Sequence, residues 1–97
     1  MNEVPKKKRV RDRALFKSMR KPYCEVCGQR AYGGIHHVTP RSCFGPDIRE
    51  NGIQLCQECH IFKAHGGHYT KEFLYEIVAK REGKTLDEVI QAVEDCR

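Results

Sequence analysis

The chain of 97 residues contains no tryptophan, and none of its apolar runs approaches the roughly 18 residues that a membrane span needs. No signal-like hydrophobic segment lies near its start, which predicts a cytoplasmic protein without a membrane partner. Only 39% of the residues are apolar, so the core is expected to be small and to gain stability from a structural metal. These absences favour one small soluble domain.

Acidic residues are scarce in the first part of the chain. Residues 1–23 hold nine lysines and arginines against two acidic residues, whereas the remaining residues hold nine basic and eleven acidic ones. The net charge of +5 therefore belongs to an N-terminal arm, as a polyanion-binding protein requires. We predict DNA contacts from Lys6, Lys7, Lys8, Arg9, Arg11 and Arg13. The run Lys6 to Arg9 also fits a nuclear-localisation signal.

Six cysteines are present, and four of them form two Cys-x-x-Cys pairs, Cys24/Cys27 and Cys56/Cys59. A secreted disulfide framework and a single redox motif are the alternatives. Two such pairs in a chain without a signal segment favour a closed thiolate cage for structural Zn²⁺. We interpret Cys43 and Cys96 as ordinary thiols.

The order of the predicted elements gives an α+β fold in two parts. Residues 1–21 form the basic arm and a short helix over 11–19, which Pro22 ends, and residues 22–97 form the domain. Within the domain we predict strands over 35–39 and 53–56, a loop over 40–52, and a helix over 57–64. Two capped helices follow over 70–96, with Phe73, Leu74, Ile77 and Val78 on the inner face of the first.

Three histidines lie in or beside the loop that the cage would close. His36 and His37 are adjacent on a predicted strand, so their side chains point to opposite faces and cannot both ligate one ion. His60 follows a cage cysteine directly, so His36 and His60 can meet over a catalytic divalent ion. His37 is then available as a general base, since histidine has a reference pKa near 6.5. The plainer alternative is that all three are polar residues of a zinc-stabilised domain.

The run Cys24-x-x-Cys27, IHHVTPR, Asn51 and LCQECH resembles the HNH endonucleases over about residues 22–65. The resemblance implies a ββα-metal fold in which His36 and His60 bind the catalytic ion, which is Mg²⁺, Mn²⁺, Ni²⁺ or Zn²⁺. It implies that His37 activates water, and that Asn51 fixes the loop and the His37 ring. Cleavage of DNA would leave a 5′-phosphate and a 3′-hydroxyl. Small proteins of this kind resemble phage or mobile-element nucleases.

The sequence departs from the family at one ligand position. Many members carry a histidine four residues after the one that matches His60, where this chain has Ala64 and then His65. His65 is therefore a third candidate ligand, and Arg41 is a candidate phosphate contact or a solvated arginine. The alternative functions are a non-catalytic zinc-containing nucleic-acid-binding module and a zinc domain that binds proteins.

Overall fold

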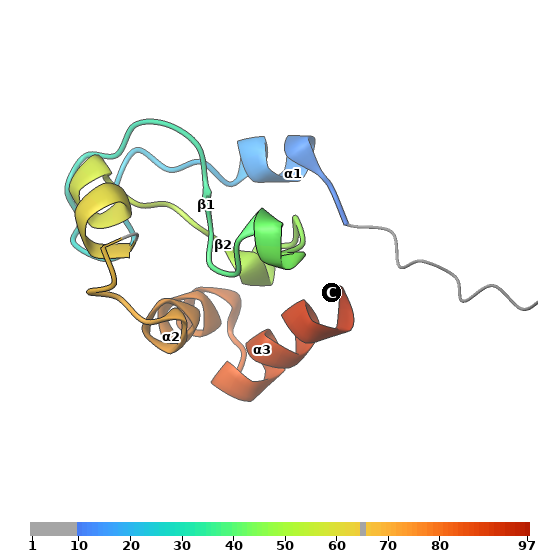
Figure 1. Ribbon diagram of the computed structural model, residues 1–97. Helices are drawn as coiled ribbons and strands as arrows, with labels where there is room; N and C mark the ends of the chain where they lie inside the picture. Colours follow the sequence, from blue (N-terminus) through green and yellow to red (C-terminus); the bar gives the residue numbers. More distant parts are fainter. Residues whose placement is uncertain (1–9, 65) are drawn as a thin grey trace, which may run out of the picture.

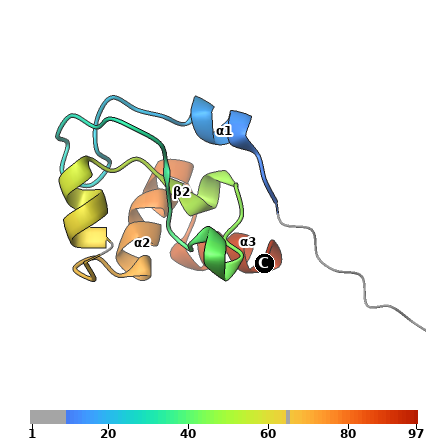
Figure 2. The same ribbon diagram turned by 45° about the horizontal axis from the view of Figure 1, so that its top comes forward.

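The computed structural model describes residues 10–64 and 66–97, and its centre is a two-stranded antiparallel sheet of β1 (His36–His37) and β2 (Gly52–Ile53). Helix α1 (Arg13–Ser18) lies on one side of this hairpin, and helices α2 (Lys71–Glu82) and α3 (Leu86–Asp95) lie on the other (Figure 1). The turned view shows the same arrangement (Figure 2). The predicted α+β class is confirmed.

Both strands are shorter than the sequence predicts, and β2 begins one residue early. The pairing extends past β1 only through the N–H of Val38, which donates to the carbonyl of Asn51 (2.9 Å). Strand β2 does not continue past Ile53, because the backbone N–H and carbonyl of Gln54 both form hydrogen bonds with Glu25 and not with strand β1. The Gln54 N–H donates to the Glu25 carboxylate (2.6 Å), and the Gln54 carbonyl accepts from the Glu25 N–H (2.8 Å). The second cysteine pair is thereby tied to the first.

Helix α1 packs onto the hairpin. Asp12 caps it by accepting the N–H of Leu15 (3.0 Å), so it begins later than predicted. Phe16 and Met19 of this region are buried. They pack closely on β2, since a Cβ at Gly52 would lie 2.9 Å from the methyl group of Met19, which would have to shift to admit it.

The helix predicted over 57–64 is present as the π-helix η3 (Glu58–Ala64). The N–H of His60 donates to the carbonyl of Cys56 (2.8 Å) at its start, so the chain coils directly out of the second cysteine pair. The predicted loop over 40–52 contains two short 3₁₀ turns, η1 (Arg41–Cys43) and η2 (Arg49–Asn51). Helices of the π type are rare and occur frequently at functional sites.

The two C-terminal helices have the predicted caps. Thr70 accepts the N–H of Phe73 (3.1 Å), and Thr85 and Glu88 form a reciprocal capping box. The predicted burial of Phe73 is wrong: it is 39% exposed and stacks on Tyr69, whereas Tyr75 is buried because α2 turns that side chain towards the hairpin. No helix among the described residues is long and apolar enough to cross a bilayer.

A buried ion pair joins α2 to the hairpin. The Arg81 guanidinium donates to the carbonyl of Gly52 (2.8 Å) and to both carboxylate oxygens of Glu25 (3.1 Å each). The side chains of Arg81 and Glu25 are only 12% and 8% exposed. One arginine thus connects the C-terminal helices, β2 and the first cysteine pair.

Candidate active site and metal centre

The four cysteines of the two pairs converge at one point. Their sulfur atoms all lie within 4.8 Å of one another, with 3.6 Å between those of Cys27 and Cys56. A tetrahedral zinc ion with Zn–S bonds of about 2.3 Å places its sulfurs about 3.8 Å apart, so this donor set fits such an ion. Among residues 10–64 and 66–97, no other cluster of three or more potential ligands converges in this way. The predicted cysteine metal site is confirmed in its position.

Backbone N–H groups are directed at two of these sulfurs, which favours the thiolate form that binds a metal. The Val26 N–H points at the sulfur of Cys24 (3.4 Å), and the Cys59 N–H points at that of Cys56 (3.5 Å). Burial raises the pKa of the Cys24 thiol, but backbone N–H groups outweigh it and bring the pKa to about 7. Burial raises the pKa of the Cys59 thiol to about 12. The thiols of Cys24 and Cys59 therefore differ in acidity, and both would have to lose their protons to bind a metal.

His36 and His60 lie face to edge beside the cysteine cluster. Their ring centroids are 5.0 Å apart at an interplanar angle of 69°, and both side chains are half-buried. They line a pocket of about 250 Å³, together with His37 and Arg41. Strand β1 supplies one ring and η3 the other, so the hairpin and the second cysteine pair position them jointly. Two imidazoles in an accessible pocket can supply two ligands to a divalent ion and leave positions for water and phosphate.

His37 has a different set of contacts from its neighbour. Its Nε2 lies 2.7 Å from Oδ1 of Asp47, and its ring packs against that of Phe16 at a centroid distance of 4.5 Å. The other carboxylate oxygen of Asp47 accepts the N–H of Asp12 (2.8 Å). Burial raises the pKa of Asp47, but the hydrogen bonds from His37 and Asp12 outweigh it and lower the pKa below 3.8.

The ionised carboxylate determines the tautomer of the His37 ring. A carboxylate can only accept a hydrogen bond, so Nε2 of the ring must carry the proton. Nδ1 is then the unprotonated nitrogen of the neutral ring. His37 also lines the histidine pocket, and a neutral imidazole there is chemically suited to remove a proton from water.

Asn51 is fully buried and holds the loop between the two strands. Its amide oxygen accepts the N–H of Thr39 (2.8 Å) and the hydroxyl of Tyr75 (2.9 Å). Its amide nitrogen donates to the carbonyls of Thr39 (3.1 Å) and Pro46 (3.0 Å). The hydrogen bonds of Asn51 therefore reach the loop that carries Asp47, and it is Asp47 that contacts the His37 ring.

The turn before Asp47 leaves no room for a side chain. A Cβ at Gly45 would lie 1.8 Å from the carbonyl oxygen of Thr39, while the Gly45 N–H donates to the carbonyl of Pro40 (2.9 Å). The loop must therefore fold tightly over its own start. This fold places the Asp47 carboxylate beside β1.

Cationic side chains border a second hollow, of about 300 Å³, on the His37 side of the hairpin. Four of its lining residues are Arg13, Lys17, Arg20 and Arg41. The structure gives these four no ion pair within its described residues, whereas five cations elsewhere bond to carboxylates: Lys21, Arg49, Arg81, Lys84 and Arg97. Unpaired cations around a hollow suit an anionic chain.

The remaining candidates lie apart from this hollow or outside the described residues. Arg11 is exposed and does not line the hollow. Lys6, Lys7, Lys8, Arg9 and His65 belong to the residues that the structure does not describe.

Sequence reasoning missed Asp47, Tyr75 and the pair Lys17 and Arg20. Asp47 stands in a loop without periodicity, so nothing local marks it as the partner of His37. The spacing of Arg13, Lys17 and Arg20 places them on one face of the predicted helix, but only Arg13 was predicted to contact DNA. The link from Tyr75 to Asn51 joins residues 24 positions apart and has no sequence signal.

Comparisons with known proteins point in the same direction as this geometry. The sequence profile of a family described as HNH endonuclease matches residues 24–72. The chain is also 36% identical over 63 residues to the type IV methyl-directed restriction enzyme EcoKMcrA of Escherichia coli strain K12. That match covers 53% of this chain but only 23% of the relative. No solved structure gives a significant match.

Proposed function

This chain belongs to the HNH endonuclease family, and on that premise we propose that it is a metal-dependent endonuclease that hydrolyses phosphodiester bonds in DNA. The observation that carries the proposal is the separation of the two central histidines. His36 meets His60 over one pocket, while Asp47 orients His37. Metal ligation and proton transfer thus have separate residues within one small site.

The proposed metals have different tasks. Cys24, Cys27, Cys56 and Cys59 would hold a structural Zn²⁺, because four thiolates form a closed site without an open position. His36 and His60 would hold the catalytic divalent ion, which supplies Lewis-acid stabilisation of the phosphate and of the leaving oxygen when bound. The cysteine site would fix the positions of His60 and the hairpin. The histidine site would face the substrate.

His37 performs the proton transfer in this proposal. Its Nδ1 removes a proton from water as the water oxygen attacks phosphorus and the bond from phosphorus to O3′ breaks. The products are a 5′-phosphate and a 3′-hydroxyl, the latter after O3′ gains a proton. Asp47 keeps the proton on Nε2 and the ring in place, and Asn51 holds the loop that presents Asp47.

The cationic hollow supports DNA as the substrate. Its four unpaired side chains lie next to His37, where phosphates on one side of the cleaved bond would run. Arg41 is shared with the histidine pocket, so it is the cation placed to contact the scissile phosphate. The basic arm, including Lys6 to Arg9 and Arg11, would add affinity that does not depend on sequence. The relative in Escherichia coli is itself a restriction enzyme by name.

His65 remains a proposed third ligand. The described part of η3 is a π-helix, in which each N–H bonds to the carbonyl five residues earlier. A spacing of five residues from His60 is therefore not an argument against ligation. His65→Ala tests this role through the metal concentration that half-maximal cleavage requires.

A nicking assay tests the function. Supercoiled plasmid is incubated with the purified protein and Mg²⁺, Mn²⁺ or Ni²⁺, and a chelator of the added ion stops the reaction. His37→Ala should lose activity by about 10² to 10⁴ because the general base is gone. His68→Ala is the matched control, since His68 is exposed and has no assigned role. DNA binding without cleavage in any metal would instead support a non-catalytic zinc-containing module.

A further inference from the structure

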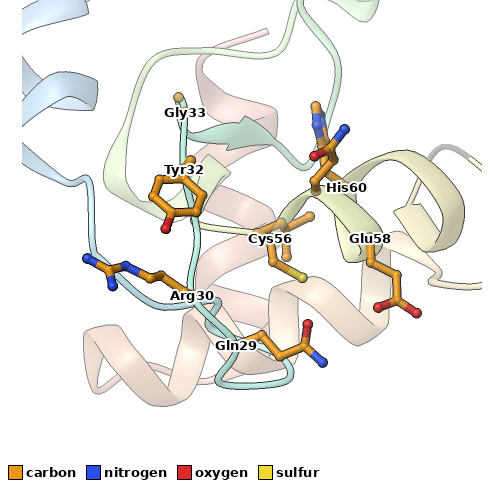
Figure 3. A pocket seen from close by; sticks show the side chains of 10 residues that line it. Gln29, Arg30, Tyr32, Gly33, Cys56, Glu58 and His60 are labelled. Carbon is orange, nitrogen blue, oxygen red and sulfur yellow. The ribbon is translucent and has the colours of Figure 1, made fainter.

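A third hollow, of about 750 Å³, is lined by His60 but not by His37. Tyr32 and Arg30 border it on one side, His60 and Glu58 border it on the other, and Cys56 lies between them (Figure 3). Its volume is within the range of small-molecule sites, about 300–1,000 Å³. The proposed chemistry does not use this space.

Tyr32 is the feature of this hollow that packing does not explain. Its side chain is 76% exposed, and the Arg30 guanidinium lies 5.7 Å from its ring centroid. An exposed aromatic ring beside a cation is the arrangement by which proteins stack single-stranded bases. The opposite wall carries a carboxylate, Glu58, which repels phosphate but accepts hydrogen bonds from the amino groups of bases. The lining therefore suits a base better than a phosphate.

The three hollows are linked by shared lining residues. The cationic hollow shares His37 and Arg41 with the histidine pocket, and the histidine pocket shares His60 with the Tyr32 hollow. Gly34 lines both outer hollows. A strand with its scissile phosphate at the histidines would have cations on one side and an aromatic platform on the other.

We propose that the Tyr32 hollow binds an unstacked nucleobase of the cleaved strand, directly beside the scissile phosphate. This inference rests on the proposed nuclease function and adds a substrate class to it. A base in a duplex must leave its stack to reach such a hollow, which costs a few kcal/mol and least where the DNA is already unpaired. The enzyme should therefore prefer DNA that is locally single-stranded over a fully paired duplex.

The test compares a fully paired duplex with the same duplex carrying a short unpaired bubble. Affinities come from fluorescence anisotropy with the zinc-loaded 97-residue chain and no added catalytic ion, and cleavage rates are measured after the ion is added. The wild type should bind and cut the bubble better. Tyr32→Ala should weaken bubble binding about 5- to 150-fold, the value of one stacked base. Its binding to the paired duplex should change by no more than about twofold.

Two further variants separate stacking from a general surface effect. Tyr32→Phe keeps the ring and should keep the preference for the bubble. Tyr23→Ala removes another exposed tyrosine, 61% exposed, that does not line the hollow, and it should change neither affinity. Equal losses on both DNAs in Tyr32→Ala, or no preference in the wild type, would overturn the inference.

The outcomes also separate this inference from the function on which it rests. Cleavage of the paired duplex with no role for Tyr32 refutes the base site and leaves the nuclease intact. Bubble-selective binding that depends on Tyr32, without cleavage in any metal, keeps the base site and refutes the nuclease.

Discussion

Replacing Asp47 by asparagine should separate the folding role of this residue from its role in catalysis. The Asp47 carboxylate accepts two hydrogen bonds, from Nε2 of His37 (2.7 Å) and from the N–H of Asp12 (2.8 Å). Asparagine has the same shape, and its oxygen can still accept the Asp12 N–H. Its amide nitrogen can only donate, so it would bond to an unprotonated Nε2 and move the proton of His37 to Nδ1. The ring stays in place, but the nitrogen that removes the proton is blocked.

The magnitude follows from these two contacts. A wrong tautomer removes the general base, so we expect cleavage to fall by about 10² to 10⁴, close to the loss in His37→Ala. Stability should fall much less, because both hydrogen bonds to the carboxylate lose their charge, a difference of about 1 kcal/mol for each. Added metal should restore neither loss, since Asp47 contacts no proposed ligand in the described structure.

The pH dependence of stability has a definite sign. The pKa of Asp47 in the folded protein lies below the ordinary 3.8, so its stabilisation is complete above that value and is lost as the pH falls through the folded pKa. The contribution of the Asp47 carboxylate to the unfolding free energy, which Asp47→Asn lacks, should be complete above about pH 5 and decline as the pH falls further. Urea unfolding at several pH values measures it, alongside plasmid nicking rates.

The control is Asp87→Asn, which changes an exposed aspartate on α3 far from the hairpin. It should leave both cleavage and stability unchanged. If Asp47→Asn cut DNA at the wild-type rate while remaining folded, the hydrogen bond to His37 would have no part in catalysis. If the variant unfolded, Asp47→Glu would test whether a carboxylate at this position restores the rate.

Three other predictions concern the metals and the arm. Cys24→Ser should lose the bound zinc and unfold, because metal binding supplies folding free energy, whereas Cys43→Ser, at an exposed thiol, should stay folded by circular dichroism. His36→Ala should lower cleavage in a way that raised metal concentration partly restores, and rescue of His37→Ala instead would reverse the two roles. Deletion of residues 1–9 should weaken DNA binding and flatten its salt dependence without changing the cleavage rate at saturating DNA. If the deletion variant bound DNA at low salt as tightly as the wild type, the arm would not contribute to DNA binding.

The sequence alone was sufficient for the features that depend on local chemistry. Two Cys-x-x-Cys pairs predict a metal cluster because cysteine spacing within each pair is set by one turn of the chain, and the sulfurs do converge. The Thr70 and Thr85 caps were predictable for the same reason, since each bonds to a backbone group three residues on. The α+β order and the family also follow from such short-range patterns.

Only the tertiary structure decided how the site is supported. Asp47 reaches His37 because Gly45 allows a tight turn and Asn51 holds the loop, and neither contact is visible from spacing along the chain. The second strand ends early because Glu25, far away in sequence, takes the backbone groups that would have continued it. Residues near in sequence can be judged from backbone geometry, but a partner 10 or 29 positions away is selected by packing of the whole domain.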